Sequence, residues 1–64
     1  METASLTDKE LVNVWRARAI ALDEQGRRAR IDGFTADAED CEAAALDYRI
    51  DADKLEAETV AHAA

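Results

Sequence analysis

The most reactive side chains of this sequence are Cys41 and His62, and the chain has one residue of each type. A catalytic thiolate needs a nearby base, and a structural zinc site needs about four Cys or His ligands. On one helix these two residues would lie about 30 Å apart, because an α-helix rises about 1.5 Å per residue. We therefore expect no catalytic residue, metal, cofactor or internal disulfide, and we predict that the protein is not an enzyme.

A second candidate for chemistry is the cluster of Arg27, Arg28 and Arg30. Three guanidinium groups could bind a phosphate or a nucleotide, and a dimer axis could double such a site. The alternative is charge balance, because four acidic residues follow closely in the sequence: Asp37, Glu39, Asp40 and Glu42. No glycine-rich phosphate loop accompanies the arginines, so charge balance is the favoured interpretation.

Negative charge dominates the composition, with a net charge of −7. Such a chain is repelled by phosphate backbones, so direct binding of nucleic acid is not expected. One acidic set lies in the second half of the chain: Asp47, Asp51, Asp53, Glu56 and Glu58. It could mimic a nucleic-acid backbone and attract a nucleic-acid-binding protein. An ordinary solvated helix face is the favoured alternative.

Local signals predict a first helix that begins near Asp8. Thr7 and Glu10 have the spacing of a capping box, in which each side chain satisfies a backbone N–H of the other residue. Leu6 and Leu11 have the spacing of a hydrophobic staple. We expect this helix to span residues 8–32.

Two glycines interrupt the helical pattern, and Gly33 is the better place for a turn. A glycine can adopt the left-handed conformation that ends many helices, and Phe34 after it can fold back on the last turn. Thr35 is expected to cap a second helix over residues 36–62, with the turn at residues 33–35. The alternative is a helix break at Gly26.

Apolar residues recur at alternating spacings of three and four in both halves, which is typical of packed helices. Folding the chain at Gly33 predicts that Val12 faces Leu55 and that Gly26 faces Cys41. The expected seam contains Val12, Trp15, Ala19, Leu22, Gly26 and Ala29 in the first helix. In the second helix it contains Ala38, Cys41, Ala45, Tyr48, Ala52, Leu55, Thr59 and His62. This pairing makes Gly26 a packing position that allows close approach.

Charged residues beside the seam give a mixed prediction. Arg18 lies close enough in register to pair with Asp51, whereas Arg16 opposite Arg49 is a mild mismatch. We therefore expect the flanking charges not to fix the register of the two helices.

More apolar residues are present than one seam can bury. The candidate second interface contains Leu11, Val14, Ile20, Leu46, Ile50 and Val60. A 64-residue chain forms a single small domain, which seldom folds stably without a staple such as a second copy. The sequence therefore predicts an all-α, two-helix antiparallel hairpin over residues 1–64 that forms a homodimeric four-helix bundle. The alternative is that the second face binds another protein.

No apolar run is long enough to span a membrane and no signal peptide is evident, so we expect a cytoplasmic protein without membrane contact. The favoured function is a small acidic protein-binding module, acting as a stoichiometric inhibitor or adaptor. Such proteins are common among accessory proteins of phages and mobile elements, for example against a host defence complex or regulator, which is an argument by analogy. The alternatives are a nucleic-acid mimic and a nucleotide binder that uses the arginine cluster.

Overall fold

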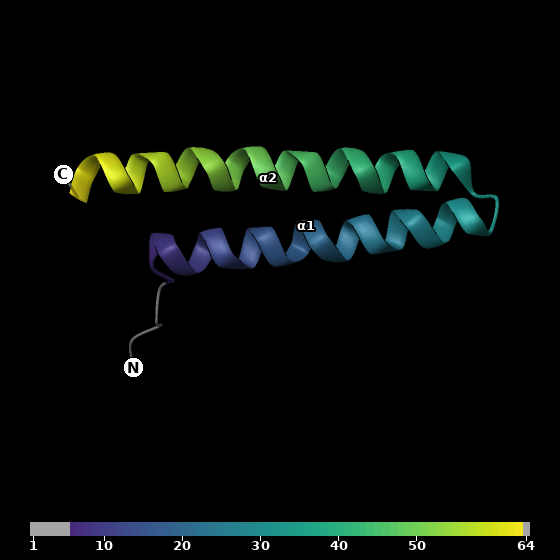
Figure 1. Ribbon diagram of the computed structural model, residues 1–64, viewed down its shortest axis with the longest axis horizontal. Coiled ribbons are helices and arrows are strands. Elements are labelled where there is room, and N and C mark those ends of the chain that lie inside the picture. Colours follow the sequence, from purple (N-terminus) through teal and green to yellow (C-terminus); the bar gives the residue numbers. More distant parts are fainter. Residues whose placement is uncertain (1–5, 64) are drawn as a thin grey trace.

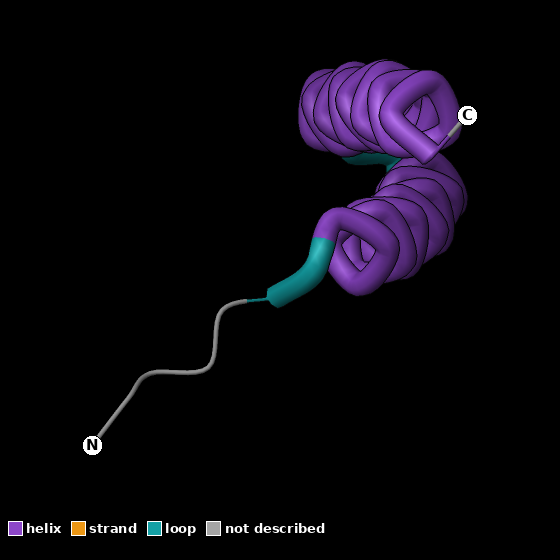
Figure 2. The backbone as a smooth tube through the Cα atoms, turned by 90° about the vertical axis from the view of Figure 1, so that its left-hand side faces the viewer, coloured by secondary structure: helices purple, strands orange, loops and turns teal. Residues whose placement is uncertain are grey.

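The chain folds into an antiparallel hairpin of two helices in a computed structural model that describes residues 6–63, with side chains described for residues 6–61. Helix α1 spans Asp8–Ile31 and helix α2 spans Thr35–Ala63. The helices lie side by side, and they approach each other most closely toward the turn (Figure 1). An end-on view shows that no further element covers either side of the pair among the described residues (Figure 2). The predicted all-α hairpin is confirmed.

The N-terminus of α1 has the predicted capping box. The Thr7 hydroxyl accepts from the backbone N–H of Glu10 at 3.2 Å, and Oε1 of Glu10 accepts from the backbone N–H of Thr7 at 3.1 Å. The Thr7 hydroxyl also donates to Oε1 of Glu10 at 2.9 Å, and the bonds from the Thr7 backbone N–H and hydroxyl to this carboxylate lower the pKa of Glu10. Leu6 of the predicted staple keeps 50% of its surface exposed. The reciprocal caps therefore place the helix start at Asp8, as predicted.

The turn is centred on Gly33, whose φ of 88° lies in the left-handed region that favours glycine. The backbone N–H of Phe34 donates to the carbonyl of Ala29 at 2.8 Å, and that of Gly33 donates to Arg30 at 3.1 Å. This pair of bonds is the Schellman arrangement. Helix α1 continues through Gly26, so the alternative of a break at Gly26 is wrong.

The predicted capping role of Thr35 is wrong by one residue. Thr35 is the first residue of α2, and the carbonyl of Phe34 accepts the first helical hydrogen bond, from Ala38 at 3.0 Å. The cap position therefore falls on Phe34, immediately after the glycine. The connection keeps its expected length of three residues but lies one residue earlier, since α1 ends at Ile31 and α2 begins at Thr35.

The core of the hairpin consists of small residues at intervals of seven. The buried residues of α1 are Val12, Ala19 and Gly26, and those of α2 are Ala38, Ala45 and Ala52. A Cβ atom added at Gly26 would lie 3.3 Å from the Ala38 carbonyl oxygen and 3.3 Å from Cβ of Cys41. The packing role of Gly26 opposite Cys41 is therefore confirmed. Every predicted seam position up to Thr59 is buried or half-buried, and the side chain of His62 lies outside the described residues.

Large apolar side chains are left out of this core. Among residues 6–61, no side chain larger than valine is buried. Trp15, Leu22, Tyr48 and Leu55 are half-buried. Ile20, Ile31, Phe34 and Val60 keep more than half of their surface exposed. The hairpin thus joins its helices through alanine and glycine and leaves its larger apolar groups available to another surface.

Candidate protein interaction surfaces

One long side of the hairpin carries a row of ion pairs between the helices. Arg16 donates to the Glu56 carboxylate at 2.9 and 3.1 Å, and it also contacts Asp53 at 3.0 Å. Arg30 makes two bonds of 2.7 Å to the carboxylate of Glu42. Between these pairs, Asp23 bonds to Arg49. We call this side the ladder flank.

The ladder flank has a regular charge pattern. Its residues recur every seven positions on each helix, and the sign alternates along both: Arg16, Asp23 and Arg30 on α1 face Glu56, Arg49 and Glu42 on α2. A slip of one heptad would place Arg16 opposite Arg49 and Asp23 opposite Glu42. Like charges would then meet, so the ladder favours the observed register.

This ladder corrects two predictions about flanking charges. The expected mismatch of Arg16 with Arg49 is absent, because each arginine turns to a carboxylate on the facing helix. The expected ion pair of Arg18 with Asp51 is also absent from the described residues. Arg18 instead lies over the Tyr48 ring, 5.8 Å from its centroid, with Nη1 3.4 Å from the hydroxyl. The seven-residue recurrence of opposite charges was the sequence signal that could have revealed the ladder.

The ion pairs shift the pKa values of their members in the expected directions. Hydrogen bonds from Arg16 lower the pKa of Glu56, and those from Arg30 lower the pKa of Glu42. The same bonds raise the pKa of Arg16 and Arg30. All four side chains are solvent-exposed, so salt screens these pairs and their main effect is on register.

The opposite long side is apolar and aromatic, and we call it the aromatic flank. Arg18 is two positions from Arg16, which is more than half a turn, so it lies on the other side of the seam. Its contact with Tyr48 places Tyr48 on the same side. Residues three, four or seven positions from Arg18 or Tyr48 lie on the same side of their helix and so belong to the aromatic flank. Its half-buried residues are Leu11, Val14, Trp15, Leu22, Cys41, Ala44, Tyr48 and Leu55.

The six residues of the candidate second interface fall on different surfaces. Leu11 and Val14 belong to the aromatic flank. Ile20, Leu46 and Val60 are each four positions after a ladder residue, so they border the ladder flank. Ile50 is one turn after Leu46, toward the outer face of α2. The hairpin therefore brings the six residues into two groups instead of one stripe.

The predicted acidic face is also divided between the two flanks. Asp53 and Glu56 contact Arg16 in the ladder. Asp51 and Glu58 border the aromatic flank, with Asp47 one turn from Asp51. Together with two acids near the turn they form an exposed acidic row along α2: Asp37, Asp40, Asp47, Asp51 and Glu58. No ion pair joins this row to a basic side chain within residues 6–61.

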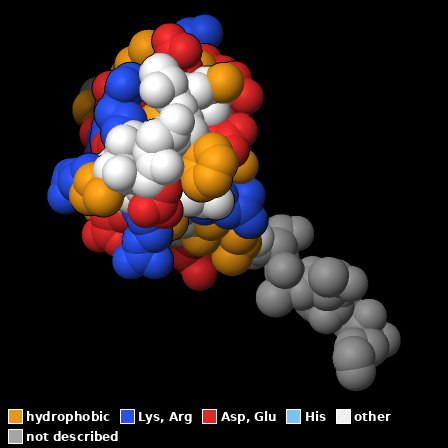
Figure 3. Space-filling model, turned by 90° about the vertical axis from the view of Figure 1, so that its right-hand side faces the viewer, with side chains coloured by type: hydrophobic (Ala, Val, Ile, Leu, Met, Phe, Trp, Pro, Cys, Tyr) orange, Lys and Arg blue, Asp and Glu red, His pale blue; other side chains and the backbone are white. Residues whose placement is uncertain are grey.

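The three residues of the arginine cluster differ in their pairing, and an anion site at the cluster stays a prediction. Arg30 is held by Glu42, which confirms charge balance for this residue. Arg27 and Arg28 are exposed and make no ion pair with the described acidic residues. Seen from the turn end, basic side chains lie at separate places among acidic and hydrophobic ones (Figure 3). Arg27 and Arg28 line one open hollow near the turn, together with Glu24 and Ile31.

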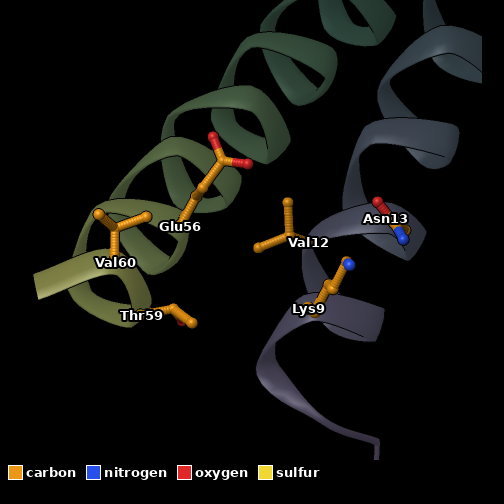
Figure 4. A pocket seen from close by; sticks show the side chains of 6 residues that line it. All are labelled: Lys9, Val12, Asn13, Glu56, Thr59 and Val60. Carbon is orange, nitrogen blue, oxygen red and sulfur yellow. The ribbon is translucent and has the colours of Figure 1, made fainter. Parts of the chain in front are cut away.

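A hollow with a volume of about 250 Å³ lies at the open end of the hairpin. Figure 4 shows Val12 between the helices, with Lys9 and Asn13 on α1 opposite Glu56, Thr59 and Val60 on α2. Thr59 donates its hydroxyl hydrogen to the Leu55 carbonyl of its own helix at 2.9 Å. Four of the six side chains that line this hollow are polar, and Glu56 among them is paired with Arg16.

No group of three or more potential metal ligands occurs among the described residues. Neither α1 nor α2 combines the length and apolar character needed to cross a membrane. Comparisons with family models, curated proteins and solved structures find no match to this chain. The two flanks are therefore the features from which a function can be argued.

Proposed function

We propose that this protein is a small non-enzymatic protein-binding module that acts by occupancy, as a stoichiometric inhibitor or adaptor. One observation carries the proposal: the core buries alanine, glycine and one valine, while the large apolar side chains stay on the surface. Exposed apolar groups beyond those of an internal core mark interaction surfaces. Burial of exposed apolar area by a partner contributes favourable binding free energy.

The ladder flank is the surface that we assign to the protein partner. Ile20 is 59% exposed on α1, and Leu46 and Val60 are 54% and 64% exposed on α2. They border charges that are already paired within the chain. A partner can therefore cover these apolar groups at the edge of the ladder without leaving isolated buried charges.

The acidic row is expected to guide the encounter with that partner. A net charge of −7 attracts proteins with basic surfaces and accelerates association, whereas buried apolar contacts slow dissociation. We place this action in the cytoplasm, and we compare it by analogy with accessory proteins of phages and mobile elements.

The acidic row also favours a second candidate, a mimic of a nucleic-acid backbone. Its five carboxylates follow one side of α2 and make no ion pair within residues 6–61. A mimic would occupy the basic groove of a nucleic-acid-binding protein, and its affinity would fall steeply with salt. Binding through Ile20 and Leu46 would depend on salt mainly in its association rate.

Affinity capture from the native cell tests the proposal. The bait is the full chain, compared with variants Ile20→Asp and Leu46→Asp and with the control Ala43→Asp, which adds the same charge on the outer face of α2. We expect one partner to be captured in stoichiometric amount by the wild type and the control, and to be lost with the two flank variants. Loss only with Asp47→Lys and Asp51→Lys would favour the mimic. Equal capture by all variants would contradict both.

A further inference from the structure

The aromatic flank carries opposite charges along its two borders. On α1, Arg18 and Arg28 lie three turns apart along the border of this flank. On α2 the border is the acidic row, which makes no ion pair within residues 6–61. Between the borders lie the half-buried Trp15, Leu22, Tyr48 and Leu55. Lys54 interrupts the acidic row between Asp51 and Glu58. The flank is therefore an apolar strip with a positive edge on α1 and a predominantly negative edge on α2.

We infer that a second copy of this chain covers the aromatic flank, related by a two-fold axis parallel to the helices, so that both turns lie at the same end. This axis places α1 of each copy on α2 of the other. The positive edge of one copy then meets the negative edge of the other, twice. The inference does not depend on the proposed function, and it leaves the ladder flank open.

The register of the hairpin aligns these charges. Gly26 packs against Cys41, so these two residues lie at the same level along the hairpin. Arg18 is eight positions before Gly26, and residue 49 is eight positions after Cys41, so these two positions also lie level. Under the two-fold axis, Arg18 of one copy lies between Asp47 and Asp51 of the other. By the same reasoning Arg28 lies level with residue 39, between Asp37 and Asp40. Each arginine of the positive edge thus meets a pair of carboxylates from the acidic row.

The same arrangement gives the protein the large apolar layer that one hairpin lacks. Two copies bring together two sets of Trp15, Leu22, Tyr48 and Leu55, which one copy leaves half-buried. A perpendicular two-fold axis, with the turns at opposite ends, would place α1 on α1 and α2 on α2. The two acidic rows would then face each other, and like charges disfavour that arrangement.

Sedimentation equilibrium of the purified full chain tests whether the second copy binds. We expect a mass twice the 7.0 kDa of one chain at micromolar concentration. Trp15 is the one tryptophan, so its emission should shift to shorter wavelength as the dimer forms. A monomer at 100-fold higher concentration, or a dimer without this shift, would overturn the proposal.

Charge reversals on the two edges of the aromatic flank test whether this flank forms the dimer interface. Arg18→Glu alone and Asp47→Lys/Asp51→Lys alone should each weaken the dimer about ten-fold or more, because like charges then meet at both edges. An equimolar mixture of the two variants should form a heterodimer with near wild-type affinity, which also shows that both still fold. The control Leu46→Asp, on the ladder flank, should leave the dimer intact. Failure of the mixture to recover, or loss of the dimer with the control, would overturn the assignment.

A distance measurement tests the orientation. A spin label at Asp32→Cys, in a Cys41→Ala background, reports on the turn of each copy. Turns at the same end should give a separation below about 20 Å, the width of a four-helix bundle. Turns at opposite ends should give about 40 Å, the length of the 29-residue α2. The longer distance would overturn the two-fold axis proposed here.

Discussion

The two long sides of this hairpin show two ways in which a helix pair can arrange its charge. On the ladder flank, Arg16, Asp23 and Arg30 each find an opposite charge on the facing helix. On the aromatic flank, Arg18 packs on a tyrosine and the acidic row makes no ion pair within residues 6–61. Charges satisfied within the chain fix its register, whereas charges left unsatisfied beside apolar groups are available to a second molecule. We therefore propose a separate task for each flank.

The largest effect is expected from Gly26, because both flanks exist only while the helices approach closely. The Gly26→Leu variant introduces a side chain where a Cβ atom alone would lie 3.3 Å from two neighbours, and we expect it to cost about 1–3 kcal/mol of unfolding free energy. Gly26→Ala should be near neutral, because about 1 kcal/mol of gained helix propensity offsets the tight contact. Urea denaturation measures both. A more stable Gly26→Leu variant would disprove the close-packing role.

A matched pair of truncations compares the flanks directly. Leu22→Ala removes a half-buried side chain from the aromatic flank and should cost about 1 kcal/mol or more. Ile20→Ala removes a side chain that is 59% exposed beside the ladder, and it should change the stability by less than about 0.5 kcal/mol. Thermal unfolding at one protein concentration measures the difference. Equal losses would show that the flanks do not differ in burial.

Reversing the central ladder pair tests the control of register. Asp23→Arg places a second arginine beside Arg49, and we expect a lower melting temperature than that of the wild type. The double variant Asp23→Arg/Arg49→Asp should recover most of the loss, since it restores opposite charges. Glu24→Arg is the control, because it changes the net charge equally without touching the ladder. A double variant no more stable than Asp23→Arg would contradict the pairing.

The smallest expected effect is a pH dependence that belongs to the ladder. The folded-state pKa values of Glu42 and Glu56 lie below the unfolded value, so their contribution is fully present above that value and is lost as the pH falls through about 5 to 3. Glu42→Gln/Glu56→Gln should therefore lose less stability than the wild type over this range. Glu24→Gln removes an exposed carboxylate outside the ladder and the acidic row, and it should retain the wild-type slope. Chemical denaturation at a series of pH values measures all three.

Local sequence signals predicted most of the fold. Thr7 with Glu10 and Gly33 with Phe34 fix the caps through bonds within a few residues, so they could be recognised from the chain alone. Gly26 could be assigned because the heptad spacing placed it opposite Cys41. Thr35 was misplaced by one residue, since the carbonyl that begins α2 depends on how tightly the glycine turn closes.

The candidate surfaces were predicted less well. Leu11 and Ile20 were assigned to one stripe, but nine positions along a helix place them on opposite sides of α1, with the seam between them. The ladder was missed because Arg16 was compared with Arg49, whereas its side chain reaches Glu56, seven positions after Arg49 on α2. The partner of either flank depends on another molecular surface, which this sequence does not contain.

The contrast between the flanks can be tested in one sample by methyl and indole NMR with a soluble paramagnetic agent, at protein concentrations below and above dimer formation. We predict that the Trp15 indole and the methyl groups of Leu22 and Leu55 become protected as the concentration rises. The methyl groups of Ile20 and Leu46 should remain equally accessible throughout. Protection of Ile20 and Leu46 instead, or no change on either flank, would contradict the assignment of the aromatic flank to a second copy.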